Sequence, residues 1–291
     1  MVLLAALLWS GGGIGVKATT GSALAVAGWR AAFALPVLVL AAAIEARRRR
    51  VAAPWSLLKR PLVWGAAASY ATMVTCYVAS VRLTTAANAI LIQYTGPVYV
   101  ALLSWPLLRE PVRRVDWIAT AGCVLGMVLF FLDEIDAKGM AGNALAVLSS
   151  MGFAGVPLLM RLEQRRRGPG ERGPLVAFAP YVSMALGNVI ALAVCAPVMA
   201  TDPLDTKTFE VVAALGSLQI GTAYWLYGSA VGRLSAVRST LLACIEPVLN
   251  PLWVFFVYGE RPGRFAALGG VIIVGAVATQ GLARRGVDSR A

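Results

Sequence analysis

Histidine is absent from the 291 residues of the chain. Its absence excludes HExxH metal sites, Ser-His-Asp triads and histidine proton relays, so proton-linked chemistry would have to use carboxylates. The glycine-rich stretches at 11–13 and 139–142 neither follow a strand nor precede Lys-Ser/Thr at the spacing of a phosphate-binding loop. No other ATP-binding motif is present. We therefore expect no cofactor and no metal, and we do not expect an enzyme.

Cysteines and charged residues are also scarce. The four cysteines lie within apolar runs without a CxxC pair, which is typical of small buried hydrophobic residues. Only 14% of the residues are charged, against roughly 25% in soluble domains. Hydrophobic residues make up 59% of the chain and the mean hydropathy is +0.74. A soluble protein of this size could not bury so much apolar surface, so the composition predicts an integral membrane protein.

The net charge of +12 could indicate a nucleic-acid-binding protein. The arginines, however, lie in short segments between apolar runs, which fits the topology of a membrane protein better. We expect a lipid bilayer and a small-molecule substrate as partners, and no nucleic acid.

Ten apolar segments divide the chain. Most of them approach the ~20 residues that a helix needs to cross a hydrocarbon core of ~30 Å. The predicted spans are 2–16, 22–44, 61–80, 83–107, 115–132, 140–160, 174–200, 209–231, 234–258 and 264–283. The first begins directly at the N-terminus without a basic leader, so we interpret it as a transmembrane helix and not as a cleavable signal peptide.

The distribution of positive charge predicts the orientation of these spans. Eighteen of the 26 Lys and Arg residues lie on the side that holds both termini, six lie on the opposite side, and Arg30 and Arg238 lie within spans. Such a bias places both termini in the cytoplasm.

The second half of the chain repeats features of the first. RLTTAANAILIQYTGPVYVALLSWPLLRE (82–110) resembles RLSAVRSTLLACIEPVLNPLWVFFVYGE (233–260). Four pairs recur at one constant spacing: Tyr77 and Tyr227, Val81 and Val231, Pro97 and Pro247, and Glu110 and Glu260. Any two apolar helices look alike, but this ordered match makes chance similarity a weaker explanation.

The repeat predicts the architecture. A five-span unit that is duplicated in tandem must enter the membrane from the opposite side the second time. We therefore predict an all-α integral membrane protein with ten transmembrane helices, built as two inverted five-helix repeats, 1–136 and 137–291. Such repeats surround a central cavity near the bilayer midplane in alternating-access transporters.

Several motifs carry a family resemblance. They are the pattern P-x(12)-E after Pro97 and Pro247, LLWSGGGIGVK at 7–17, the Trp29-Arg30 pair, and the glycines that follow each glutamate. In order and in duplicate, they resemble the EamA-type repeat of ten-span members of the drug/metabolite transporter superfamily. The resemblance covers nearly the whole chain.

The resemblance implies a secondary transporter of the bacterial inner (plasma) membrane that exports small metabolites. Amino acids, including aromatic ones, threonine or methionine, are the first expectation. Drugs or hydrophobic cations are the alternative, and a structural membrane protein is a weaker one. The cavity would be lined mainly by spans 1, 3, 4, 6, 8 and 9. A phosphorylated substrate is disfavoured because Arg238 is the only cationic candidate for the cavity. We expect a monomer. Coupling of transport to protons is compatible with the sequence but is not required by it.

Glu246 is the candidate on which the site prediction depends. It lies halfway along an apolar span, where a charge costs ~2.5–3.5 kcal/mol on insertion scales and therefore usually faces a polar cavity. It could bind a substrate ammonium or exchange a proton, or it could be a structural residue bonded across helices. The first repeat has Gly96 at the matching position.

The two mid-span prolines are candidate hinge residues. Pro97 and Pro247 each free a backbone carbonyl within a span, which favours either a hinge beside the cavity or a simple packing kink. Arg238 could bind a carboxylate or gate the site, or its side chain could reach the interface. We expect a structural role for Arg30, because its span should be peripheral.

Polar and aromatic residues within the spans complete the predicted substrate site. The predicted substrate-binding residues are Trp9, Ser10, Tyr70, Tyr77, Gln93, Tyr94, Tyr99, Ser150, Tyr224, Tyr227, Arg238, Glu246 and Asn250.

Overall fold

The computed structural model describes residues 1–51, 54–132, 139–166, 174–249, 253, 256 and 263–288. Throughout these ranges the secondary structure is helical, without a strand. The predicted all-α class is therefore confirmed for the described part of the chain. The predicted boundary between the two repeats falls at 136/137, outside the described residues.

The helices follow the predicted spans closely. Those of the first part are α1 (Val2–Ser10), α2 (Gly12–Lys17), α3 (Ala23–Arg48), the 3₁₀ helix η1 (Pro54–Lys59), α4 (Pro61–Leu83), α5 (Ala86–Gln93), α6 (Gly96–Leu108) and α7 (Arg114–Phe130). Those of the second part are α8 (Met140–Arg165), α9 (Pro174–Thr201), α10 (Thr206–Ala214), the π-helical segment η3 (Leu215–Thr222), α11 (Ala223–Val231), α12 (Ala236–Ala243) and α14 (Arg264–Asp288).

Six of the described segments are long and apolar enough to cross a membrane, by length and composition alone. They are Ala23–Arg48, Pro61–Leu83, Ala87–Leu108, Met140–Arg165, Pro174–Thr201 and Arg264–Ala283. Of the other predicted spans, 115–132 corresponds to the single 17-residue helix α7, 2–16 and 209–231 are divided into shorter helices, and 234–258 lies partly outside the described residues. The count of ten spans stays a prediction.

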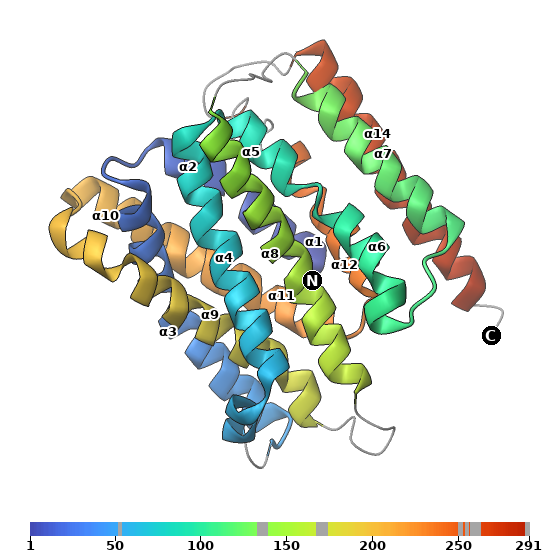
Figure 1. The fold of residues 1–291 in the computed structure, drawn as a ribbon, viewed down its shortest axis with the longest axis horizontal. Coiled ribbons are helices and arrows are strands. Elements are labelled where there is room, and N and C mark those ends of the chain that lie inside the picture. Colours follow the sequence, from blue (N-terminus) through green and yellow to red (C-terminus); the bar gives the residue numbers. More distant parts are fainter. Residues whose placement is uncertain are drawn as a thin grey trace.

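Helices from the two parts of the chain pack against each other in pairs. Figure 1 shows α7 and α14 side by side along one edge, and α3 packs against α9 while α4 packs against α8. Glycines permit these close approaches: a Cβ on Gly28 of α3 would lie 2.3 Å from Sδ of Met199, and one on Gly152 of α8 would lie 2.5 Å from the carbonyl oxygen of Ser69. The residues of the two predicted repeats are thus interleaved and share one body.

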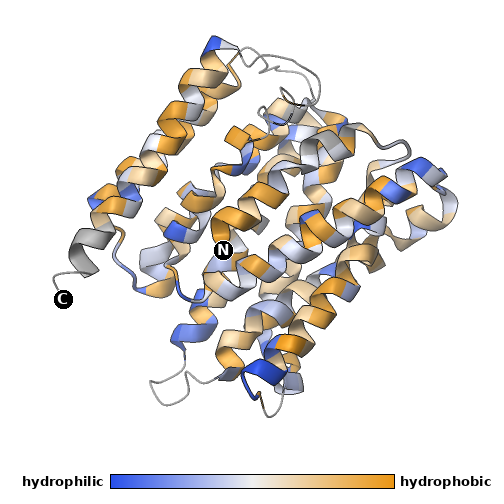
Figure 2. Ribbon diagram, turned by 180° about the vertical axis from the view of Figure 1, so that it is seen from behind, coloured by the Kyte–Doolittle hydropathy of each residue, from blue (hydrophilic) through white to orange (hydrophobic). Residues whose placement is uncertain are grey.

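The outward faces of the helices are apolar. Figure 2 shows hydrophobic residues along the lengths of the helices. On α14, for example, Leu268, Val271 and Val274 are exposed. Exposed apolar side chains along a helix suit contact with lipid acyl chains.

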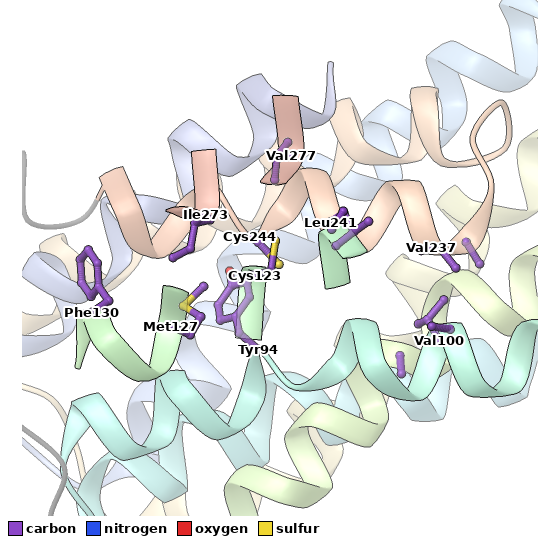
Figure 3. Packing of buried hydrophobic residues seen from close by; sticks show 14 of the residues in the cluster. Tyr94, Val100, Cys123, Met127, Phe130, Val237, Leu241, Cys244, Ile273 and Val277 are labelled. Atoms are coloured by element: carbon purple, nitrogen blue, oxygen red, sulfur yellow. The ribbon is translucent and has the colours of Figure 1, made fainter. Parts of the chain in front are cut away.

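A hydrophobic cluster joins both parts of the chain near the break between α5 and α6. Figure 3 shows Tyr94, Cys123, Met127, Cys244 and Ile273 in this cluster, and all five side chains are buried. The four cysteines are free thiols. Three are buried and one is half-buried, which confirms the prediction that they pack as small hydrophobic residues.

Candidate functional site

A two-residue break divides the helix that contains Pro97. Thr85 caps α5 by accepting a hydrogen bond of 3.0 Å from the backbone N–H of Asn88, and α5 ends at Gln93. Tyr94 and Thr95 form a turn, after which α6 begins with Pro97 in its first helical turn. Proline is tolerated there because the N–H groups of a first turn lack partners within the helix. The break therefore places Tyr94 at a point where the helix is interrupted.

The same arrangement occurs at the matching position of the second part. Ser235 caps α12 by accepting a hydrogen bond of 3.4 Å from the backbone N–H of Arg238. Both α5 and α12 have 8 residues, and each is followed by a two-residue turn. After the turn at Cys244 and Ile245 the chain is helical again at Glu246 and Pro247. The break places Glu246 at the start of a new helical segment.

The two breaks meet. The hydroxyl of Tyr94 donates a hydrogen bond of 2.5 Å to Oε2 of Glu246. A carboxylate within a predicted span needs such a donor, because a polar group without a partner is costly away from water. This contact makes Glu246 tolerable in the apolar segment, yet it engages one carboxylate oxygen and leaves the other able to take part in binding.

A second polar pair joins Arg30 of α3 to Gln219 of the π-helical segment η3. The Nη2 group of Arg30 donates a hydrogen bond of 2.7 Å to Oε1 of Gln219, and Nε2 of Gln219 donates one of 3.1 Å to the backbone oxygen of Trp9. A Cβ on Gly12 would lie 2.5 Å from Nε2 of Gln219, so the glycine provides the space for this amide. π-helical turns are rare and occur frequently at functional sites. Gln219 thus holds the side chain of Arg30 in a fixed place.

Both polar pairs border one cavity of about 70 Å³. Its lining residues come from α1, α3, α4, α5, α8, η3 and α11 and from the break regions: Trp9, Arg30, Met73, Val74, Tyr77, Gln93, Tyr94, Phe153, Gln219, Ile220, Tyr224 and Glu246. The cavity therefore carries one guanidinium, one carboxylate, two amides and several aromatic rings. We call it the central cavity.

Aromatic rings form a continuous wall at the central cavity. The ring centroids of Trp9 and Tyr224 lie 4.8 Å apart, as do those of Tyr70 and Tyr224. Tyr70 is fully buried behind the wall, and its hydroxyl accepts a hydrogen bond of 3.0 Å from Nδ2 of Asn188. These contacts fix the orientation of the Tyr224 ring.

Six of the predicted substrate-binding residues line the central cavity. They are Trp9, Tyr77, Gln93, Tyr94, Tyr224 and Glu246. Tyr70 and Tyr227 lie in the layer behind it, through ring contacts with Tyr224 and Trp9. Tyr77 lines the cavity, but its repeat mate Tyr227 is not among the lining residues: it is buried and packs against Trp9, with ring centroids 5.5 Å apart.

Of the remaining predicted residues, those that the structure describes are not among the lining residues. Ser10 accepts a hydrogen bond of 2.8 Å from Nε1 of Trp253, and Ser150 shares one of 3.0 Å with Thr95. Tyr99 packs against the hydrophobic cluster shown in Figure 3. Arg238 lies in the first turn of α12 and does not line the cavity. Asn250 lies outside the described residues.

Two polar lining residues were missed by the sequence analysis. Arg30 is only 6% exposed and lines the central cavity, whereas the sequence analysis expected a structural role for it in a peripheral span. Its own charge within a span was the signal, because intramembrane arginines usually face a bundle interior or cavity. Gln219 could have been found in the same way, as an amide within an apolar run.

Residues 1–132 and 140–279 match the EamA-like transporter family. The chain belongs to this family. Among its relatives, the "Uncharacterized transporter YwfM" of Bacillus subtilis is 25% identical over 217 residues, which cover 72% of this chain and 69% of the relative. An "Uncharacterized transporter" of Archaeoglobus fulgidus is 26% identical over 210 residues, 68% of each chain.

A solved structure shares the fold of this EamA-like transporter. It is titled "Crystal structure of protein", and the superposition has a TM-score of 0.73 at 20% sequence identity. The match covers 98% of this chain and 97% of the other. The structural match concerns the fold alone. The match to the family confirms the resemblance seen in the sequence motifs, and it supports a membrane transporter as the class of the protein.

Proposed function

We propose that the protein is a secondary transporter that exports small zwitterionic metabolites, amino acids first among them, by alternating access. One observation carries the proposal: the guanidinium of Arg30 and the carboxylate of Glu246 border the same cavity. A free amino acid carries one carboxylate and one ammonium group, which are the complementary charges. Arginine binds carboxylates through a planar fork of donors, and a carboxylate accepts hydrogen bonds from an ammonium.

The aromatic wall supports amino acids with apolar or aromatic side chains. Trp9, Tyr224 and Phe153 surround the polar groups and offer apolar ring faces. Ligand cavities of this kind, largely apolar with a few polar groups that orient the ligand, are typical of small-molecule sites. Phenylalanine, methionine and threonine are therefore the substrates to test first.

The size of the central cavity supports a site that changes shape during transport. Its volume is about 70 Å³, well below the ~300 Å³ at which small-molecule cavities begin. An amino acid needs more room, so the cavity must widen to admit it. The two helix breaks, at Tyr94-Thr95 and Cys244-Ile245, contain or directly precede the lining residues Tyr94 and Glu246, and they offer points at which the chain can bend.

The matching breaks also support two inverted five-helix repeats. α5 and α12 have the same length, the same kind of hydroxyl cap and the same two-residue turn at equivalent places. The two ranges that match the family, 1–132 and 140–279, agree with a duplicated unit. With ten spans, the distribution of Lys and Arg supports a protein of the bacterial inner membrane with both termini on the cytoplasmic side. One copy of the chain contains both breaks and the central cavity, which supports a monomer.

The experiment is counterflow in proteoliposomes that contain the purified protein. Radiolabelled phenylalanine, methionine and threonine are supplied outside vesicles preloaded with the unlabelled amino acid, with and without a pH gradient. We expect saturable accumulation of at least one amino acid over empty liposomes, and its loss in Glu246→Gln. An effect of the pH gradient on the wild type that is absent from Glu246→Gln would indicate proton coupling. No saturable flux for any amino acid, together with flux of a lipophilic cation, would overturn the proposal.

A second candidate function is the export of hydrophobic cations. The favouring observation is that Glu246 lines the same cavity as the rings of Trp9 and Tyr224, because aromatic faces attract organic cations. The presence of Arg30 on the same cavity opposes it. Tetraphenylphosphonium flux in the same vesicles discriminates the two: a cation exporter would transport it and would gain flux in Arg30→Gln.

A further inference from the structure

A second, larger cavity lies at the arginine-rich ends of four helices. It has a volume of about 320 Å³ and lies between the residue that follows α3, the C-terminal parts of α8 and α11, and the first turn of α9. Four arginines line it: Arg49, Arg161, Arg165 and Arg233. It shares no lining residue with the central cavity. We call it the arginine cavity.

Positive charge exceeds negative charge around the arginine cavity. Its described lining includes four arginines and no carboxylate. One oxygen of Glu110 accepts from Nε of both Arg161 and Arg165, at 2.7 and 3.1 Å. Glu45 is likewise shared, by Arg49 at 2.8 Å and by Arg48 at 3.6 Å. Each of these two carboxylates thus pairs with two guanidinium groups, so that among the described residues the arginines outnumber their acidic partners.

Arg233 adds to the excess of positive charge at the arginine cavity. It follows the C-terminal end of α11 and is exposed, and within the part of the chain that the structure describes it forms no ion pair. Gly232 beside it approaches Gln164 closely, because a Cβ there would lie 2.8 Å from Nε2 of that residue. α8 and the end of α11 therefore lie close together at the cavity, and Arg233 is an exposed residue of its lining.

We propose that the arginine cavity binds a phosphate group, either in the headgroup of an anionic phospholipid or in a small phosphorylated solute. Guanidinium groups match phosphate oxygens in a bidentate geometry, and several of them around one cavity select an anion. Basic cavities between helix ends are typical of sites for anionic lipid headgroups. The volume is within the range of ligand sites, which begins at ~300 Å³. The site is distinct from the proposed transport site and does not depend on it.

Three variants test the charge and the volume of the cavity separately. Arg233→Gln removes an exposed lining charge without breaking an ion pair of the described structure. Ala177→Phe fills the cavity from the first turn of α9 and leaves all four arginines in place. Arg114→Gln is the matched control, because Arg114 is an exposed arginine at the start of α7 that does not line the cavity.

The measurement is binding to the full-length protein in nanodiscs, read as a shift of the unfolding temperature and by native mass spectrometry. One arm supplies phosphatidylglycerol in a phosphatidylcholine nanodisc. The other adds inorganic phosphate or glycerophosphoglycerol to a pure phosphatidylcholine nanodisc. We expect Arg233→Gln to weaken binding about tenfold, the worth of one charge-assisted hydrogen bond, and Ala177→Phe to abolish it. Binding in the lipid arm alone identifies a headgroup site, and binding in the soluble arm identifies a solute site.

The outcome that overturns the proposal is equally specific. If neither arm gives binding, or if Arg233→Gln and Ala177→Phe bind both probes as well as Arg114→Gln does, the arginine cavity is not a phosphate site. The unfolding temperature of each variant without probe separates misfolding from loss of binding. Should Ala177→Phe fail to fold, Arg233→Gln alone decides the result.

Discussion

Tyr94 and Glu246 are joined by a hydrogen bond of 2.5 Å, although they belong to helix breaks more than half a chain apart. Each residue follows a short capped helix, and each lines the central cavity. The acid that looked out of place in an apolar segment thus has a partner, and that partner is supplied by the other copy of the same local structure.

Glu246→Gln should reduce the export of zwitterions strongly. The amide keeps the size of the side chain and can still accept the bond from Tyr94, but it loses the charge that would pair with a substrate ammonium. We expect a fall of about tenfold to a hundredfold in counterflow, which corresponds to one charge-assisted hydrogen bond. Glu210→Gln, an exposed glutamate of α10, is the matched control and should transport at the wild-type rate. Equal rates in the two variants would refute the role of Glu246.

Arg30 should be needed for the transport of substrates that carry a carboxylate. Arg30→Gln removes the proposed partner of the substrate carboxylate, so amino-acid counterflow should fall about tenfold or more. Arg30→Lys keeps the charge but loses the planar fork, and we expect it to recover only part of the flux. Arg47→Gln, an exposed arginine in the last turn of α3, is the control. An unchanged flux in Arg30→Gln would show that the guanidinium only braces Gln219.

Gly12→Ala should lower the rate of transport because it displaces Gln219, although the added methyl group does not contact the substrate. The added methyl would lie 2.5 Å from Nε2 of Gln219, so the amide must move away and its bond to Arg30 is disturbed. We expect a lower rate of counterflow with little change in the unfolding temperature. Gly11→Ala is an adjacent control, because its methyl would make an ordinary contact of 3.6 Å with the oxygen of Leu8. The prediction fails if both variants transport alike.

Gly269→Val should destabilise the pair formed by α7 and α14. A Cβ at this position would lie 2.4 Å from the oxygen of Gly126 and 2.6 Å from the nitrogen of Phe130, and backbone atoms cannot step aside cheaply. Overpacking typically lowers the free energy of unfolding by about 1–3 kcal/mol. Gly275→Val is the control on the same helix, where a Cβ meets no atom within 4 Å. Urea or thermal unfolding in detergent should show the difference, and equal stabilities would contradict it.

Acid should loosen the connection between the segment after α2 and the start of α10. Asp205 caps α10 and accepts hydrogen bonds from the backbone N–H and the hydroxyl of Thr208, at 2.9 and 2.7 Å, and from the hydroxyl of Thr20. These donors hold the pKa of Asp205 below its usual range. A depressed pKa contributes stability that is present at neutral pH and is lost as the pH falls below about 5.

Asp205→Asn keeps a capping side chain but cannot titrate. We therefore expect its unfolding temperature to lie below that of the wild type at neutral pH and the gap to narrow on acidification. Glu210→Gln serves again as the control and should follow the wild type. A gap that stays constant from neutral pH to about pH 3 would contradict the assignment.

The fold was largely predictable because apolar length and hydroxyl or proline signals mark helix ends directly. The ranges 61–80 and 140–160, for instance, became α4 and α8 with only their C-terminal ends extended. Glu246 and Tyr94 were found because a charge and a proline within an apolar run indicate a polar environment. The sequence could not reveal that they would bond to each other, because that contact depends on how the two breaks are packed.

Arg30 and Tyr227 show what the sequence leaves open. Both depend on which face of a helix meets the cavity, and a linear pattern does not determine how helices are rotated around it. Tyr227 matches Tyr77 along the chain, but Trp9 packs against its ring. Gln219 lies in a π-helical segment, whose wider turn changes the direction of each side chain relative to an α-helix.

The bond between Tyr94 and Glu246 also has a kinetic consequence. A hydrogen bond to a charged group contributes about 1.5–3 kcal/mol, so breaking it slows a motion by a factor of about ten to a hundred and fifty. A substrate ammonium that replaces the tyrosine hydroxyl at Glu246 would remove this barrier. The contact is therefore suited to act as a latch that cargo itself releases.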